Sequence, residues 1–291
     1  MERAAYASLA ERGILEVAGD DRVAFLQGLV SNDVAKVAAD RAVYAALLTA
    51  QGKFLHDFFI VAQGDAFYLD AEAARLADLQ KRLTLYKLRS KVSFADAGAR
   101  FTVAAAWGGD ALGLLGLAGP GSAKAFAGGI AYADPRLAAL GARFLLPRGG
   151  ENAIEPAGFA RADAAAYDRH RLALGVPDGS RDLEIERSIL LENGFEELNG
   201  VDFQKGCYMG QELTARTKYR ALIKKRLLPV NVDGPLPAPG TKVMAGEQEM
   251  GEMRSGRDGA ALAVLKLDAL ETKLTAGGAT IIPRKPEWLK F

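Results

Sequence analysis

Cysteine and histidine are scarce in this chain of 291 residues, which contains one Cys and two His. A single cysteine excludes a disulfide bond within the chain. An iron–sulfur cluster usually needs four thiolates, or two thiolates with two imidazoles, and a structural zinc site needs four ligands of the same kinds. No metal site is therefore predicted from this chain alone, and a cluster would take most of its ligands from a second chain. The composition also offers no convincing Cys–His pair for a protease.

The chain likewise has no excess of charge and no long apolar run. Its 37 basic and 36 acidic residues give a net charge of +1, whereas a domain that binds duplex nucleic acid usually has a clear basic excess. No apolar run approaches the roughly 20 residues that cross a bilayer. The first residues, MERAAYASLAERGILEV, have the pattern of neither a signal peptide nor a transit peptide. We therefore expect a cytoplasmic protein without a membrane segment.

Short apolar runs and helical spacing of apolar residues alternate along most of the chain, which is typical of a mixed fold. The expected helices are 22–30, 71–86 and 163–174, and the expected strands include 14–17, 42–48, 54–61, 66–70, 91–106 and 141–147. Ser122 is expected to cap a further short helix. After residue 222 only short strands and turns follow. We predict an α+β domain over 1–223 and an all-β domain over 224–291.

His56 and Asp57 are neighbours in the strand predicted over 54–61, so their side chains should point to opposite faces. Strict alternation places Phe54, His56, Phe58 and Ile60 on one face and Leu55, Asp57, Phe59 and Val61 on the other. A carboxylate among large apolar neighbours either has a partner or faces a cavity, which makes Asp57 a candidate functional residue. His56 is expected to make a structural hydrogen bond.

The only cysteine, Cys207, lies in the segment DFQKGCYMGQELTAR, residues 202–216. Gly206 allows a sharp turn before it, and helical composition begins near Gly210. At the N-terminus of a helix, and beside the ammonium of Lys205, the thiolate form would be favoured. The opposite interpretation, a buried and inert cysteine, is equally open from the spacing.

Two further features have a functional and a structural interpretation each. Glu192 follows an apolar run and either accepts hydrogen bonds from a heterocycle such as a pterin or faces solvent. The stretch 216–226 has six cations and no acid, which form either a positive patch for an anionic ligand tail or an RNA phosphate, or a solvated face. These cations are Arg216, Lys218, Arg220, Lys224, Lys225 and Arg226.

The segment KGCYMGQELTAR resembles the signature of the YgfZ-type folate-binding proteins. That family is related to the glycine-cleavage T-protein, an aminomethyltransferase, and includes a mitochondrial iron–sulfur assembly factor. FLQGLVSNDV at 25–34, QGKFLHDFFIV at 51–61, RHRLALGVPDG at 169–179 and the stretch 186–207 resemble other parts of the family. The resemblance implies a T-protein-like α+β portion around a central cavity and a C-terminal β-barrel.

The same resemblance implies tetrahydrofolate, or a one-carbon derivative of it, as the cofactor. By position, Glu192 matches the carboxylate that the family aims at the pterin ring, and Asp57 matches an acid on the corresponding hairpin of the transferase. The catalytic candidates are Cys207, Lys205 and Asp57. The candidates for binding the cofactor are Glu192, Asn32, Asp33, Tyr208, Gln211, Glu212 and Arg216.

We expect an accessory factor for iron–sulfur protein maturation or repair that binds tetrahydrofolate. Cys207 is expected to be a functional thiol that opens onto the folate cavity, as a nucleophile, a redox group or a transient cluster ligand shared with a partner. The partners of this factor would be iron–sulfur assembly or client proteins. The alternative is a folate-dependent aminomethyltransferase that uses Asp57. The KGCY motif and His56 depart from the transferase pattern, so we expect an accessory factor rather than a turnover enzyme. A third alternative is a binding module that takes no folate.

Overall fold

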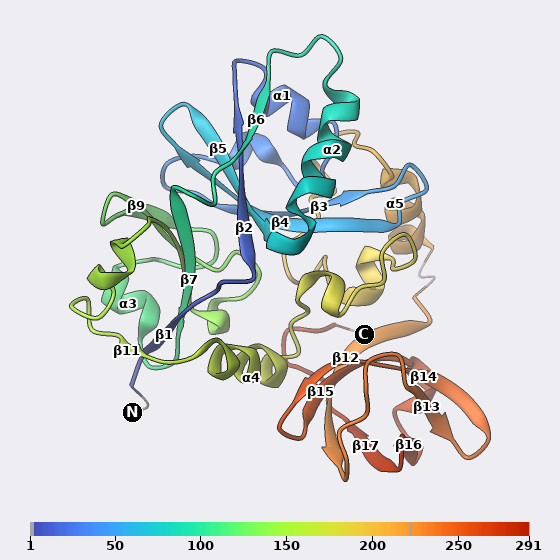
Figure 1. The fold of residues 1–291 in the computed structure, drawn as a ribbon. Coiled ribbons are helices and arrows are strands. Elements are labelled where there is room, and N and C mark those ends of the chain that lie inside the picture. Colours follow the sequence, from blue (N-terminus) through green and yellow to red (C-terminus); the bar gives the residue numbers. More distant parts are fainter. Residues whose placement is uncertain (1–2, 221–222, 291) are drawn as a thin grey trace.

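The computed structural model describes residues 3–220 and 223–290, and in these residues the chain forms two β-sheets, a closed β-barrel and five α-helices. The sheets and helices make up the larger part, and the barrel is a separate body at the C-terminal end (Figure 1). The predicted α+β fold with a C-terminal barrel is therefore confirmed. No helix in the described ranges has both the length and the apolar character that crossing a membrane requires.

The first sheet has the strand order β3-β4-β5-β2-β6 and carries the centre of the fold. Its strands are β2 (Arg12–Ala18), β3 (Val43–Leu48), β4 (Phe54–Gln63), β5 (Ala66–Glu72) and β6 (Ser93–Asp96). Helices α1 (Arg22–Gln27) and α2 (Leu76–Lys87) cover one face through an apolar cluster that includes Leu26 and Leu79. The other face carries aromatic residues such as Tyr44 and Phe59, and these pack toward the second sheet.

The second sheet has the order β11-β1-β7-β10-β9-β8. Its strands are β1 (Ala5–Ser8), β7 (Phe101–Trp107), β8 (Ala123–Phe126), β9 (Gly129–Ala133), β10 (Ala142–Pro147) and β11 (Ala160–Arg161). The remaining helices are α3 (Ala111–Leu115), α4 (Ala164–Leu174) and α5 (Gln211–Tyr219). Short 3-10 helices are η1 (Val34–Lys36), η2 (Ala73–Arg75), η3 (Ala138–Leu140), η4 (Gly150–Ala153), η5 (Gly179–Arg181), η6 (Leu190–Asn193) and η7 (Leu267–Ala269).

The barrel closes in the order β12-β15-β14-β13-β16-β17 around its own apolar core. Its strands are β12 (Lys225–Asp233), β13 (Lys242–Ala245), β14 (Gln248–Arg257), β15 (Ala260–Lys266), β16 (Leu274–Ala276) and β17 (Ala279–Pro283). The buried carboxylate of Asp182 joins the barrel to the larger part, because it accepts hydrogen bonds from Arg171 Nη1 (2.6 Å) and from Ser255 Oγ (2.5 Å) on β14. The domain division at 223/224 stays a proposal, which the start of β12 at Lys225 supports.

Some element boundaries differ from the sequence prediction. The helix expected over 71–86 begins only at Leu76, because β5 continues to Glu72 in pairing with β2. The single strand expected over 91–106 is two strands, β6 and β7, separated by a turn in which Gly98 N donates to Asp96 Oδ1. No helix follows Ser122: its Oγ bonds to Gly119, and the chain continues as β8.

Strand β4 also departs from strict alternation at its start. A β-bulge pairs Leu47 with His56 and Leu48 with Phe54, so one residue of β4 is extra. The bulge turns Phe54 to the face of Phe59 and moves Leu55 to the helix-covered face. The predicted faces of Phe54 and Leu55 are therefore wrong, because a bulge shifts the two-residue period by one.

Candidate functional site

A cavity of about 310 Å³ lies between the first sheet, β10, α4 and the barrel. Its wall takes residues from β2, β4, β10 and α4, from the chain before and after α4, and from β14 of the barrel. In Figure 1, α4 lies below β2 and β4 and next to the barrel. The volume falls at the lower end of the range for small-molecule pockets. The cavity is therefore the natural candidate for a ligand site.

Asp57 on β4 is the carboxylate that sequence reasoning singled out, and it lines this cavity. Its side chain is buried, and Tyr44 Oη donates a hydrogen bond to Oδ2 at 2.8 Å. The other oxygen, Oδ1, has no hydrogen-bond partner within the described part of the chain. Burial raises the pKa of Asp57 to about 6. The carboxyl group is thus buried, half-satisfied and able to change its protonation near neutral pH.

A glycine keeps the space beside this carboxylate open. Gly179 has a φ of +48°, and a Cβ there would lie 2.2 Å from Glu72 Oε1 and 3.2 Å from Asp57 Oδ1. Its own backbone conformation also favours glycine. Any side chain at this position would displace the Glu72 carboxylate and crowd the unpartnered oxygen of Asp57.

His56 points to the opposite face, as predicted, and Nε2 lies 2.8 Å from Asp78 Oδ2 on α2. Burial lowers the pKa of His56 to about 4, so the imidazole is neutral near pH 7 and donates its N–H to that carboxylate. The expected structural hydrogen bond of His56 is confirmed.

Three buried arginines surround the ring of Phe59 in the cavity wall. The guanidinium carbons of Arg12, Arg136 and Arg143 lie 5.8, 4.8 and 4.1 Å from the ring centroid. Asp70 accepts from Arg12 Nε and from Arg143 Nη2, both at 2.6 Å. Burial alone would raise the pKa of Asp70, but the two guanidiniums lower it below its usual value. The wall therefore carries several charged side chains, and two of them, Arg12 and Arg143, are paired with the buried Asp70.

The rim of the cavity joins the larger part to the barrel. Asp168 on α4 accepts from Arg181 Nη1 and from Arg257 Nε, each at 3.0 Å. Arg257 belongs to β14, and both arginines are about 40% exposed, at 43% and 40%. These guanidiniums can meet an anionic group at the mouth of the cavity. Sequence reasoning missed the cavity arginines because positions 12, 136, 143, 181 and 257 share no local motif.

Cys207 is exposed in the loop before α5, so the interpretation as a buried, inert thiol is wrong. Its neighbours lie on either side of the edge of the first sheet: Tyr208 packs in the aromatic cluster of the cavity face, and Met209 packs against the cluster under α1. Met209 N also donates to Gly28 O at 3.1 Å. Among the described residues, those lining the cavity do not include Cys207. The thiol therefore lies outside the described lining of this cavity, near the β3 edge, and the prediction that Cys207 opens onto the cavity is wrong.

Lys205, the predicted activator of Cys207, makes hydrogen bonds to the end of α1. Its Nζ donates to Gln27 O at 2.7 Å and to Val30 O at 2.5 Å, and it lies 5.0 Å from the centroid of the Tyr208 ring. Burial lowers its pKa to about 8. The ammonium caps the C-terminal end of α1, so these contacts give Lys205 a structural role. Its predicted activation of Cys207 stays a prediction.

Asn32 and Asp33 make local contacts. Asn32 Nδ2 donates to Tyr44 O and to Asn199 O, each at 2.7 Å. Asp33 caps η1 by accepting from Ala35 N at 3.1 Å. Both side chains thus fix the chain next to β3, and neither belongs to the described lining of the cavity.

The predicted residues of α5 also stay outside the cavity lining that the structure describes. Gln211 Oε1 accepts from Tyr208 N at 3.3 Å and so orders the turn into the helix. Glu212 and Arg216 form an ion pair one turn apart on the exposed side of α5. Such an exposed pair contributes little to stability.

Glu192 in η6 is half-buried and lies 3.6 Å from Lys225 Nζ, not in the described cavity wall. Burial raises its pKa, and the nearby lysines oppose that effect. The predicted basic patch is similarly neutralised in part: Lys218 pairs with Glu196 at 2.5 Å and Arg226 with Glu197 at 3.1 Å. These ion pairs give little support to a continuous positive patch for an anionic ligand tail or an RNA phosphate.

The described residues hold no group of three or more His, Cys, Asp or Glu that could bind a metal ion. Any metal cluster ligated through Cys207 would need ligands from another molecule.

Comparisons with known proteins agree with this architecture. Residues 2–140 match the GCVT N-terminal domain, and residues 224–291 match the CAF17 C-terminal β-barrel domain. The chain is 36% identical over 273 residues to the human protein named iron-sulfur cluster assembly factor IBA57, mitochondrial, covering 87% of this chain and 75% of that protein. The mouse protein of the same name is 32% identical, with 90% and 78% covered. The crystal structure of the glycine cleavage system aminomethyltransferase T from Bartonella henselae has a similar fold, with a TM-score of 0.78, 15% identity, and 99% of this chain and 86% of that chain covered.

These relatives correct one prediction. The expected cytoplasmic location is contradicted, because the curated relatives are named as mitochondrial proteins.

Proposed function

We propose a function on the premise that this chain belongs to the family of IBA57 iron–sulfur cluster assembly factors. In this proposal the chain presents Cys207 to an iron–sulfur assembly partner and holds a tetrahydrofolate in its central cavity. The two roles use separate places in the fold, the loop beyond β3 and the cavity beside β4. The exposure of the only cysteine is the observation that carries the proposal.

The position of Cys207 supports a role as one ligand of an iron–sulfur cluster that a partner protein also ligates. A cluster needs about four protein ligands, and this chain supplies one sulfur from an exposed loop that packing of Tyr208 and Met209 holds in place. A partner would provide the remaining ligands. An exposed thiol on an ordered loop is accessible to such a partner without unfolding either protein.

The cavity supports folate binding through two features. The unpartnered Oδ1 of Asp57 can accept a hydrogen bond from an N–H group of a reduced pterin, which satisfies a buried acceptor. Arg181 and Arg257 at the rim can meet the carboxylates of the glutamate tail. The resemblance to the YgfZ-type folate-binding proteins points to the same cofactor. These residues fit the ligand, whereas the match of Glu192 to the pterin carboxylate remains a separate prediction.

The aminomethyltransferase alternative rests on Asp57 as well. A buried carboxyl group with a pKa of about 6 in a cavity wall has the properties of a general acid or base near neutral pH. Incubation with tetrahydrofolate and an aminomethyl donor would release ammonia and form methylene-tetrahydrofolate at enzyme-like rates if this alternative holds. We expect no such turnover.

The test combines binding and complementation. Calorimetric titration with folinic acid should show binding to the wild-type protein, a loss of at least tenfold in affinity for Asp57→Asn, and no change for the surface variant Asp65→Asn. Absence of binding to the wild type would remove folate from the proposal. Cys207→Ser should bind folinic acid normally and fail to restore iron–sulfur enzyme activity in cells that lack the protein. Full restoration by Cys207→Ser would exclude the thiol role.

A further inference from the structure

The C-terminal end of α2 and the first residue of the loop to β6 expose three large apolar side chains within four positions. Leu85, Tyr86 and Leu88 are 68%, 43% and 88% exposed, and they account for three of the eight exposed large apolar side chains in the described part of the chain. In Figure 1 the loop between α2 and β6 lies at the end of the molecule that is opposite the barrel. Isolated apolar residues on a surface need no explanation, but a cluster of them does.

The segment that carries these apolar side chains is also rich in basic residues. Between Asp78 and Asp96 the sequence has five basic residues and no acid. Arg82 forms ion pairs with Asp78 and Glu186, whereas Arg89 is exposed beside Leu88. The basic residues are Lys81, Arg82, Lys87, Arg89 and Lys91. Next to the loop, Leu88, Arg89, Ser90 and Asp21 border an open hollow of about 580 Å³.

The backbone holds the loop in a strained shape. Leu88 has a φ of 42° and a ψ of −112°, a conformation that a branched residue rarely adopts. The base of the loop is fixed because Lys91 N donates to Asp21 Oδ2 at 2.7 Å and Ser90 N donates to Lys87 O at 2.8 Å. Gly19 packs so tightly there that a Cβ would lie 2.1 Å from Lys91 O. Strain and apolar exposure both cost free energy, and strained residues of this kind cluster at functional sites.

We propose that the tip Leu85–Lys91 is a docking surface for a folded protein partner that offers an apolar pocket bordered by carboxylates. The exposed leucines fill the pocket, and the basic residues of the same segment pair with the acids. A fixed, strained backbone suits a shaped pocket, because a preorganised loop loses little conformational freedom on binding. A fluid lipid surface needs no fixed shape, and three side chains bury little area in it.

This surface is distinct from the one that presents Cys207. The first sheet runs from β3 to β6, and the thiol loop lies beyond β3 whereas the tip leads into β6, at the opposite edge. The inference therefore goes beyond the proposed function, and its test does not depend on the thiol or on folate.

The experiment first identifies the partner and then measures binding to it. The photoreactive residue p-benzoylphenylalanine is placed at Leu88, and in a control protein at Leu114, which is 48% exposed elsewhere on the surface. Illumination in the source cells should link one protein at the first position and not at the second. That protein is then purified and titrated with the wild type, Leu88→Gly, Arg89→Glu and Leu114→Gly.

Leu88→Gly is the decisive variant, because glycine accepts the positive φ and the protein should fold at least as stably. We expect Leu88→Gly and Arg89→Glu to weaken binding at least tenfold, Leu114→Gly to leave it unchanged, and added salt to lower the affinity of the wild type. Equal affinity for wild type and Leu88→Gly, or no linkage specific to position 88, would overturn the proposal. Sedimentation of the wild type, but not of Leu88→Gly, with phosphatidylglycerol vesicles would also overturn it in favour of a membrane.

Discussion

The carboxyl group of Asp57 should make the stability of the protein depend on pH in a direction opposite to that of an ordinary paired acid. Burial raises its pKa from 3.8 to about 6. The folded state then holds this proton more tightly than the unfolded state does. The contribution of Asp57 to stability is therefore fully present below about pH 4 and is lost as the pH rises through about 6.

The size of the effect follows from the pKa values. A difference of about two pKa units corresponds to roughly 3 kcal/mol, at about 1.4 kcal/mol per unit. Asp57→Asn keeps an acceptor for Tyr44 Oη but carries no charge at any pH. Part of this change falls below pH 4, so the stability of the variant relative to wild type should increase by roughly 2.5 kcal/mol between about pH 4 and pH 7.5.

Urea unfolding of both proteins at the two pH values measures this difference. Asp70→Asn is the matched control, because Arg12 and Arg143 lower the pKa of Asp70 and its loss should destabilise the protein most at neutral pH. A stability difference between Asp57→Asn and wild type that is the same at both pH values would refute the reasoning.

Three further changes probe other contacts of the fold. Asp182→Ala removes the acceptor that Ser255 and Arg171 share, and should lower the free energy of unfolding in urea by about 3–5 kcal/mol. A decrease below about 1 kcal/mol would contradict the role of Asp182 in joining the barrel to the larger part. Lys205→Ala loses two hydrogen bonds from a charged group and should lower the free energy of unfolding by about 1.5–3 kcal/mol. Iodoacetamide should alkylate Cys207 in this variant at the wild-type rate, and a slower rate would show that Lys205 activates the thiol. Glu192→Gln should weaken folinic acid binding if the resemblance assigns its role correctly, and unchanged affinity in calorimetry would remove Glu192 from the ligand site.

The sequence predicted the parts of the site that depend on local pattern. Alternation along a strand separated His56 from Asp57, and the structure places them on opposite faces. The same rule failed for Phe54 and Leu55, because the pairing of β4 with β3 contains a bulge that no feature of one strand reveals. Turn and helix composition also placed Cys207 correctly in a loop before α5.

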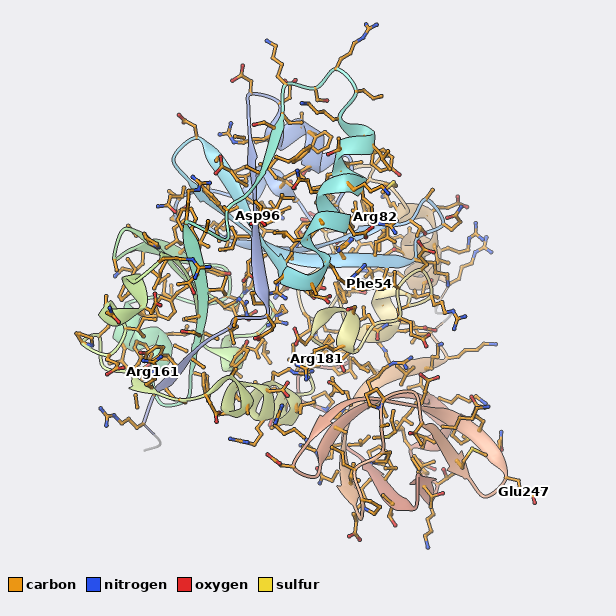
Figure 2. The ribbon with its side chains drawn as sticks, viewed as in Figure 1. Phe54, Arg82, Asp96, Arg161, Arg181 and Glu247 are labelled. Atoms are coloured by element: carbon orange, nitrogen blue, oxygen red, sulfur yellow. The ribbon has the colours of Figure 1, made fainter. Side chains whose placement is uncertain are left out.

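Contacts between segments that lie far apart along the chain could not be predicted from the sequence. Lys205 is next but one to Cys207 along the chain, yet its ammonium binds carbonyl groups at the end of α1, which only the tertiary packing brings near. Arg12 and Arg143 meet at Asp70 although more than a hundred positions separate them. Charged residues close in sequence need not act together, and those far apart can share one carboxylate. In Figure 2, Arg181 lies near the centre of the molecule, between the larger part and the barrel.

A crystal structure with bound folinic acid tests the central claim most directly, since that claim separates a ligand cavity at Asp57 from a thiol on the outer surface. We predict that the pterin lies within hydrogen-bond distance of Asp57 and that Cys207 contacts no ligand atom. A pterin beside the sulfur of Cys207, or a ligand outside the cavity, would contradict the account.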